Sequence, residues 1–513
     1  MIDTARESTV TTARRKAVEE GPQHPPSTIL GTLRRLGPGL ILAGAIVGSG
    51  ELIATTRVGA EAGFWLLWII LLGCTLKVFT QIEFGRYAIT WSRTTLDALD
   101  TLPGPRFKVN WLVWYWFVIV LLIISQNGGI VGGVGQALAI LQPLSSEGVQ
   151  YNQLYDQLVG LRVELAMAAE AGAANLPILE QQVAELSARV DVLPQPADIA
   201  IWATLTAVLT SALMYIGRYG LIQVVTTVLV GSFTVITIAS VVMLQSTEWA
   251  IQWSDVVNGL RFTLPTTGGT TEGLATALAA FGMIGLSAGE IIMYPYWCLE
   301  KGYAQWSGPR DSTDAWATRA RGWMRVMHVD AWLSMGVYTI STVAFYLLGA
   351  AVLSRAGLNV EGEGLIRTLA EMYVPVLGPW AESIFLIGAV TILYSTYFVF
   401  AAGFARIIAD SLILLGLIPT EARVRWIRIV GVALPLAALV TYFFVRAPVA
   451  MILAAGLGQS TILPMLGGAA LYFRYKRIDV RLRPGLIWDL FLWISVAGLL
   501  VAGVYSIYGT FFR

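Results

Sequence analysis

Two glutamates lie where an apolar chain should cross a membrane, and each follows a run of small residues. Glu51 comes after Gly48-Ser49-Gly50, in an apolar stretch that begins at Gly37. Glu290 comes after Ser287-Ala288-Gly289, again within an apolar stretch. A carboxylate at mid-membrane depth costs roughly 3 kcal/mol or more, and such a residue is by default a functional one. The two glutamates are therefore the first candidates for holding an ion.

The small residues before each glutamate predict that the helix breaks there. A glycine inside a helix costs roughly 1 kcal/mol relative to alanine. Backbone that leaves the helix within a membrane is tolerated only where it is buried in protein or lines a polar cavity. Corresponding breaks in the two halves of a chain are typical of inverted-repeat secondary transporters that work by alternating access.

The residues at the breaks allow two kinds of substrate. Bare N–H groups at the start of two half-helices would bind a small anion such as bicarbonate, with Na⁺ or H⁺ held by the glutamates. Alternatively, Glu51 and Glu290 would be ligands of a divalent metal cation, Mg²⁺ or Mn²⁺. We favour the anion, because the glycines leave the N–H groups free. The hydroxyls of Thr55 and Tyr294 are further candidates, for the coupling ion or metal and for the substrate respectively.

Composition identifies a polytopic membrane protein. The chain has 513 residues, of which 56% are hydrophobic and 13% charged, and its mean hydropathy is +0.67. Its net charge of +1 gives no reason to expect a nucleic-acid partner. Two histidines and two cysteines leave little room for a resident metal centre. We find no nucleophile–base pair or phosphate loop, so we expect no enzyme and no cofactor beyond a bound Na⁺ or divalent cation.

Apolar runs of about 20 residues predict eleven membrane spans. The predicted spans are 36–60, 63–91, 109–141, 198–217, 220–245, 273–299, 326–353, 380–409, 425–445, 448–473 and 486–510. Basic residues cluster at the ends that an N-terminus in the cytoplasm would place inside. The sequence therefore predicts a multi-pass protein of the plasma membrane with an extracytoplasmic C-terminus.

Four segments follow from this pattern. Residues 1–35 form a disordered cytoplasmic tail, residues 36–142 the first three spans and residues 198–513 the remaining spans. Residues 143–197 are polar and carry two runs of leucine and valine at heptad spacing, separated by a turn. We expect this segment to be an extracellular helical hairpin.

Several motifs resemble the Nramp family, the natural resistance-associated macrophage proteins. These motifs are Gly37-Pro38, Ala54-Thr55, Gly63-Phe64-Trp65-Leu66-Leu67-Trp68, and Gln459 with Pro464. The resemblance extends over residues 36 to about 475. It implies an all-α LeuT-type fold with two inverted five-helix repeats, an eleventh helix, and broken first and sixth helices. It also implies that Gln459 lines the site and that Ser395 and Thr396 bind a coupling ion.

The metal-binding motifs of the family are not preserved in this sequence. In the same register, the aspartate and asparagine of the first helix fall on Gly48 and Glu51. The methionine and histidine of the sixth helix fall on Gly289 and Ile291. We therefore expect a divergent, Nramp-related branch that carries a small inorganic ion, acts as a monomer in the lipid bilayer, and is not a transition-metal/proton symporter.

Overall fold

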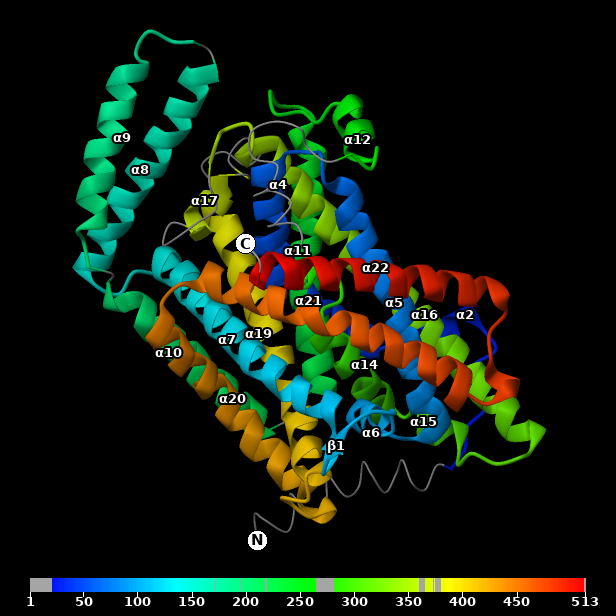
Figure 1. The fold of residues 1–513 in the computed structure, drawn as a ribbon. Coiled ribbons are helices and arrows are strands. Elements are labelled where there is room, and N and C mark those ends of the chain that lie inside the picture. Colours follow the sequence, from blue (N-terminus) through cyan, green and yellow to red (C-terminus); the bar gives the residue numbers. More distant parts are fainter. Residues whose placement is uncertain are drawn as a thin grey trace.

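The computed structural model describes residues 21–170, 172–194, 196–216, 219–263, 281–358, 365–371, 373 and 380–511. Among these residues, nine helices are long and apolar enough to cross a membrane. They are α5 (Leu67–Trp91), α7 (Trp111–Leu141), α10 (Ala197–Ile216), α11 (Tyr219–Leu244), α16 (Asp314–Leu348), α19 (Ala381–Leu414), α20 (Arg423–Val445), α21 (Pro448–Tyr472) and α22 (Leu486–Phe511). Each corresponds to a predicted span, and together they form one bundle (Figure 1).

Shorter elements connect or extend these helices. They are α2 (Ile29–Arg35), α6 (Thr95–Asp100), α12 (Trp253–Gly259), α15 (Tyr303–Ser307), α17 (Leu365–Glu371), the strands β1 (Arg106–Phe107) and β2 (Val109–Asn110), the π-helical η2 (Gly349–Leu353) and η5 (Phe473–Arg477), and the 3₁₀ turns η4 (Thr420–Ala422) and η6 (Val480–Leu482). β1 and β2 form a small antiparallel hairpin.

The remaining two spans are interrupted, as the glycine and glutamate pattern predicts. The first consists of α3 (Pro38–Ile46), a two-residue turn, the π-helical segment η1 (Gly50–Thr55) and α4 (Thr56–Ala62). The sixth is non-helical from Gly282 to Ser287 and continues as α14 (Ala288–Lys301). Residues 273–280 of the predicted sixth span lie outside the described residues. The structure thus confirms both breaks.

A carboxylate from another helix fixes the start of the first broken helix. Asp330 of α16 accepts hydrogen bonds from the backbone N–H groups of Gly37 (3.0 Å) and Gly39 (2.6 Å). These N–H groups belong to the first turn of α3, where a helix has donors without a partner of its own. The contact therefore anchors α3 against α16.

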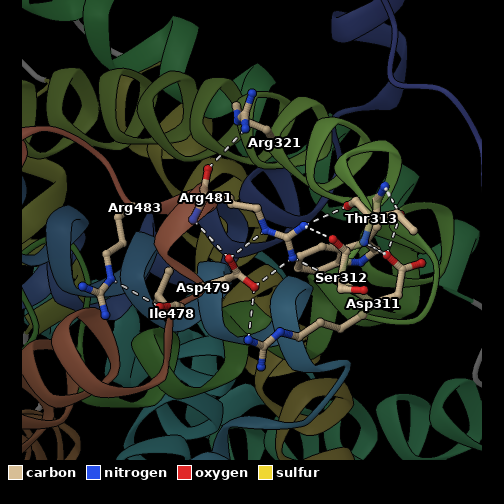
Figure 2. Close-up of polar contacts among 10 residues, drawn as sticks. Asp311, Ser312, Thr313, Arg321, Ile478, Asp479, Arg481 and Arg483 are labelled. Atoms are coloured by element: carbon tan, nitrogen blue, oxygen red, sulfur yellow. Dashed lines mark hydrogen bonds and ion pairs between the residues drawn. The ribbon is translucent and has the colours of Figure 1, made fainter.

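α16 is longer than the sequence predicted, since it begins at Asp314 rather than near residue 326. Thr313 caps its N-terminus by accepting a hydrogen bond from the Trp316 N–H (3.2 Å). The loop after η5 holds this cap in place (Figure 2): the Arg481 guanidinium donates to the carbonyls of residues 311–313 and to Asp479. The same guanidinium, with that of Arg310, holds the pKa of Asp479 well below its usual range.

The polar segment between α7 and α10 consists of two packed helices, α8 (Ser146–Glu170) and α9 (Leu176–Asp191). Leu158, Leu186 and Val190 form the centre of their shared apolar seam, which matches the heptad positions in the sequence. The pair projects from the bundle at the same end as α12 (Figure 1). The expectation that this end is extracellular stays a prediction.

Candidate functional site

A small polar cavity lies where the two broken helices meet α7, α19 and α21. Its polar or sulfur-containing lining residues are Gln126, Asn127, Ser287, Glu290, Met293, Thr396 and Gln459. Ala45, Ile123, Ile130, Gly289, Phe400 and Phe404 complete the wall. Five of the thirteen residues thus come from the predicted site list: Ser287, Gly289, Glu290, Thr396 and Gln459.

Glu290 is the carboxylate of this cavity. Its Oε2 accepts a hydrogen bond from the Ser287 N–H (2.8 Å), and the Ser287 hydroxyl accepts one from the Gly289 N–H (3.1 Å). This is a capping box, in which a serine and a glutamate three residues later satisfy the first N–H groups of a helix. The box fixes the Glu290 side chain at the N-terminus of α14 while leaving it partly exposed to the cavity.

Glu51 has a different environment, because it is completely buried and is not among the residues lining the cavity. Its Oε1 accepts hydrogen bonds from the Gly285 N–H and the Thr342 hydroxyl, both at 3.2 Å. Its Oε2 accepts a longer one from the Gly48 N–H (3.4 Å). Glu51 therefore connects the first broken helix to the sixth and to α16.

These bonds occupy part of the predicted anion cradle. The N–H groups of Gly48 and Gly285 point to Glu51, and that of Ser287 points to Glu290. The N–H of Gly289 is shared by the Ser287 hydroxyl and Gln459 Oε1 (3.2 Å). A free anion would have to compete with carboxylates of the chain itself for these donors. For Gly48 and Ser287 the reason is local, because a glutamate three residues later reaches back to the exposed N–H group, whereas the Gly285 N–H bonds to Glu51 of the other break.

Three amide side chains lie beside Glu290. Gln459 Nε2 donates to Gln126 Oε1 (2.9 Å), and Asn127 Nδ2 donates to the Ile123 carbonyl (2.8 Å). The buried Asn127 Oδ1 has no hydrogen-bond partner among the described residues. A buried acceptor without a donor costs free energy, so this oxygen is available to a ligand.

The hydroxyls of α19 approach the end of α3. Ser395 Oγ donates to the Gly44 carbonyl (2.9 Å), and Thr396 Oγ1 donates to the Ala45 carbonyl (3.1 Å). Gly48 packs directly against Thr396, since a Cβ at position 48 would lie 1.7 Å from Thr396 Oγ1. The structure thus brings both predicted coupling-ion hydroxyls to the first break, where they already bond to the backbone.

Other predicted residues lie near the breaks without facing the cavity. Thr55 Oγ1 donates to the Gly50 carbonyl within its own helix (3.1 Å). The Tyr294 hydroxyl donates to Asp330 (3.1 Å) and therefore points to α16. Ser49 is buried, and its hydroxyl has no partner among the described residues. Ala288 is the first residue of α14 and is likewise buried.

The predicted site list lacks Gln126 and Asn127, which line the cavity, and sequence reasoning missed two further residues of this region. Met293, one turn into α14, lines the cavity with its thioether side chain, although the family register had placed the methionine position on Gly289. Lys77 of α5 is completely buried and donates to the Ile284 carbonyl (2.9 Å) and to the Phe281 carbonyl. A single lysine within an apolar span was a readable signal, because charge inside a membrane is costly.

Two broken helices that face each other across a buried polar cavity, within a bundle of membrane-length helices, define a secondary transporter with the LeuT-type fold. Comparison with known proteins identifies the family. A model of natural resistance-associated macrophage protein-like sequences matches residues 148–509, and the chain belongs to this Nramp family. The matched region starts after the first broken helix, so membership is established by other residues than those at Gly48–Glu51. Members of the family are transporters and not enzymes.

Solved structures show the same fold. A mutant of the manganese transporter from Eremococcus coleocola superposes with a TM-score of 0.63 and 13% sequence identity, covering 96% of this chain and 91% of that chain. MhsT in complex with L-phenylalanine gives a TM-score of 0.52 and 13% identity, covering 94% of this chain and all of that chain. An uncharacterized protein of Pasteurella multocida is 34% identical over 98 residues, which is 19% of this chain and only 21% of that relative.

Proposed function

We propose that this chain is an alternating-access importer of a divalent metal cation and that Glu290 is its principal charged ligand. The supporting observation is the donor set of the cavity, in which the Glu290 carboxylate lies among the oxygens of Gln126, Asn127 and Gln459. Family members of known structure include a manganese transporter, which agrees with a metal substrate. The occupied N–H groups at both breaks remove the main reason for preferring bicarbonate.

The ligand types favour a divalent cation that keeps some of its water. No described group of three or more histidine, cysteine, aspartate or glutamate side chains could enclose a metal. One carboxylate with neutral amide oxygens suits Mg²⁺ or Mn²⁺, both of which accept oxygen ligands. The Met293 thioether adds a softer ligand, which favours a transition metal over Mg²⁺. Mn²⁺ is therefore the first substrate to test.

The formal charges at the centre also favour a cation. Counted as formal charges, Glu51 and Glu290 contribute −2 and Lys77 contributes +1, and Lys77 lies within electrostatic reach of both glutamates. This formal balance is negative, which favours a cation over an anion as the substrate. If a monovalent ion is coupled to transport, the hydroxyls of Ser395 and Thr396 beside the carbonyls of α3 are its proposed location.

Transport by proteoliposomes tests the proposal. Influx of Mn²⁺ and of Mg²⁺ is measured with and without external Na⁺, and internal pH is followed under an inward bicarbonate gradient. We expect saturable Mn²⁺ influx that the substitution Glu290→Gln abolishes. Glu61→Gln is the matched control, because Glu61 lies at the end of the first broken helix and pairs with Arg57 (2.5 Å) away from the cavity. Bicarbonate-driven alkalinisation without metal influx would overturn the metal proposal and restore the anion hypothesis.

A further inference from the structure

The ammonium group of Lys77 lies at the break of the sixth helix. The side chain comes from α5, is completely buried, and donates hydrogen bonds to the carbonyls of Phe281 and Ile284. Its Nζ also lies 4.7 Å from the centroid of the Phe281 ring. Carbonyl oxygens and an aromatic face are the neighbours that a buried cation requires. The break of the sixth helix gives Lys77 both kinds of neighbour, but none of these neighbours is negatively charged.

Glu51 supplies that charge from the opposite side of one peptide group. The Ile284 carbonyl accepts from Lys77 Nζ (2.9 Å), and the Gly285 N–H donates to Glu51 Oε1 (3.2 Å). The Ile284 carbonyl and the Gly285 N–H belong to the same planar, resonance-coupled peptide unit. An ammonium at its oxygen and a carboxylate at its N–H polarise this unit in the same direction, so each bond strengthens the other. Lys77 and Glu51 are thus linked through the two ends of one peptide group.

The bridged peptide lies in the non-helical segment just before α14. Gly285 has a φ of +63°, and a Cβ there would lie 2.9 Å from the Cα of Cys74 in α5. Glycine is therefore required both for the left-handed conformation and for the close approach. Two residues further on, Ser287 begins the capping box that fixes Glu290. The position of this peptide consequently influences where α14 begins and where the Glu290 side chain enters the cavity.

We propose that Lys77 is a tethered cation, which permanently occupies a monovalent-cation position at the break of the sixth helix and, with Glu51, positions Glu290. The carbonyl oxygens that bind its ammonium group are the ligand type that a free Na⁺ or K⁺ would use. Removing the side chain while keeping Glu51 therefore leaves an empty position with carbonyl oxygens and a nearby uncompensated negative charge. This proposal does not depend on the identity of the transported substrate.

Thermal unfolding of the purified full chain in detergent tests the proposal without a transport assay. The melting temperature of Lys77→Ala is measured against NaCl, KCl and methylammonium chloride, with N-methylglucamine chloride keeping the ionic strength constant. We expect Lys77→Ala to melt below the unmodified protein and to be stabilised saturably by at least one small cation. The cation response of the unmodified protein, including any from the proposed position at Ser395 and Thr396, is the baseline, and the double variant Glu51→Gln/Lys77→Ala should not exceed it. A response of Lys77→Ala no different from that of the unmodified protein overturns the proposal.

A charge-balanced pair of variants decides the question if Lys77→Ala does not fold. Glu51→Gln leaves the ammonium group without its negative partner, whereas Glu51→Gln/Lys77→Met removes both charges. We expect the double variant to melt above Glu51→Gln, because it leaves no buried charge without its counterpart. The effects of the two substitutions are then not additive. A double variant that melts below Glu51→Gln contradicts the pair. Gln81→Met is the matched control, since Gln81 is a buried, uncharged residue one turn further along α5 and should not confer cation dependence.

Discussion

The two helix breaks both consist of three small residues followed by a glutamate, Gly48-Ser49-Gly50-Glu51 and Ser287-Ala288-Gly289-Glu290, yet the two glutamates have different surroundings. Each glutamate accepts a hydrogen bond from the N–H three residues before it. At the sixth helix the serine returns a side-chain bond and closes a capping box. At the first helix the corresponding residue is Gly48, which has no side chain to return. The second oxygen of Glu51 accepts hydrogen bonds from Gly285 and Thr342.

The comparison teaches that two intramembrane carboxylates with the same local hydrogen bond can have different surroundings, one facing a cavity and the other packed between helices. With the box closed, Glu290 is fixed by its own helix and remains available to the cavity. Glu51, which has no capping box, bonds to neighbouring helices and is buried away from the cavity. Four substitutions separate these roles, and they are ordered by the loss of unfolding free energy that we expect.

Replacement of Glu51 by glutamine should have the largest effect. Removing one of two linked buried charges costs up to about 3–5 kcal/mol, because the remaining charge loses the group that compensates it. Lys77 is that remaining charge. Chemical unfolding in detergent measures the loss, and a loss below that for Ser287→Ala would contradict the structural role of Glu51.

Gly48→Ala should have the second largest effect. A Cβ at this position would lie 1.7 Å from Thr396 Oγ1, so α3 and α19 must move apart. Overpacking of a tightly packed interior costs about 1–3 kcal/mol. Gly336→Ala in α16 is the matched control, since a Cβ there meets nothing within 4 Å and should be neutral or stabilising. Equal melting temperatures for the two variants would show that the Thr396 side chain can move aside at no cost, which would contradict this prediction.

Ser287→Ala should cost about 1 kcal/mol, the usual price of losing a helix N-cap. Ser49→Ala in the other break should cost less, because the Ser49 hydroxyl has no partner among the described residues. The comparison of the two unfolding curves tests whether only one of the breaks contains a capping box. Ser287→Thr keeps the hydroxyl and should restore the stability lost in Ser287→Ala.

Glu290→Gln should change stability least, by about 0.5 kcal/mol or less, since glutamine also serves in a capping box. Metal influx should nevertheless be lost, because the substitution removes the carboxylate of the cavity. Melting temperature and influx measured on the same preparation separate the two effects. A variant that unfolds readily and still transports would reverse the assigned roles of Glu51 and Glu290.

Much of the fold was predictable, because spans of membrane length and breaks rich in glycine leave strong patterns in a sequence. The capping box was readable too, as a serine followed three residues later by glutamate. The role of Lys77 was not, since its partners are the carbonyls of Phe281 and Ile284, some 200 residues away along the chain. Backbone carbonyls are the same in every residue and leave no signal. The three extra turns at the start of α16 likewise depend on a loop that is distant in sequence.

The contact between Gly48 and Thr396 restricts which residues can occur together at these two positions. In the family register, position 48 is where an aspartate would bind metal, and here any residue with a Cβ at that position collides with the threonine. We therefore expect an aspartate at position 48 to occur together with a smaller residue at position 396, which would also release the Ala45 carbonyl. Relatives of this chain should therefore carry either an aspartate at the position of Gly48 or a threonine at the position of Thr396, and not both.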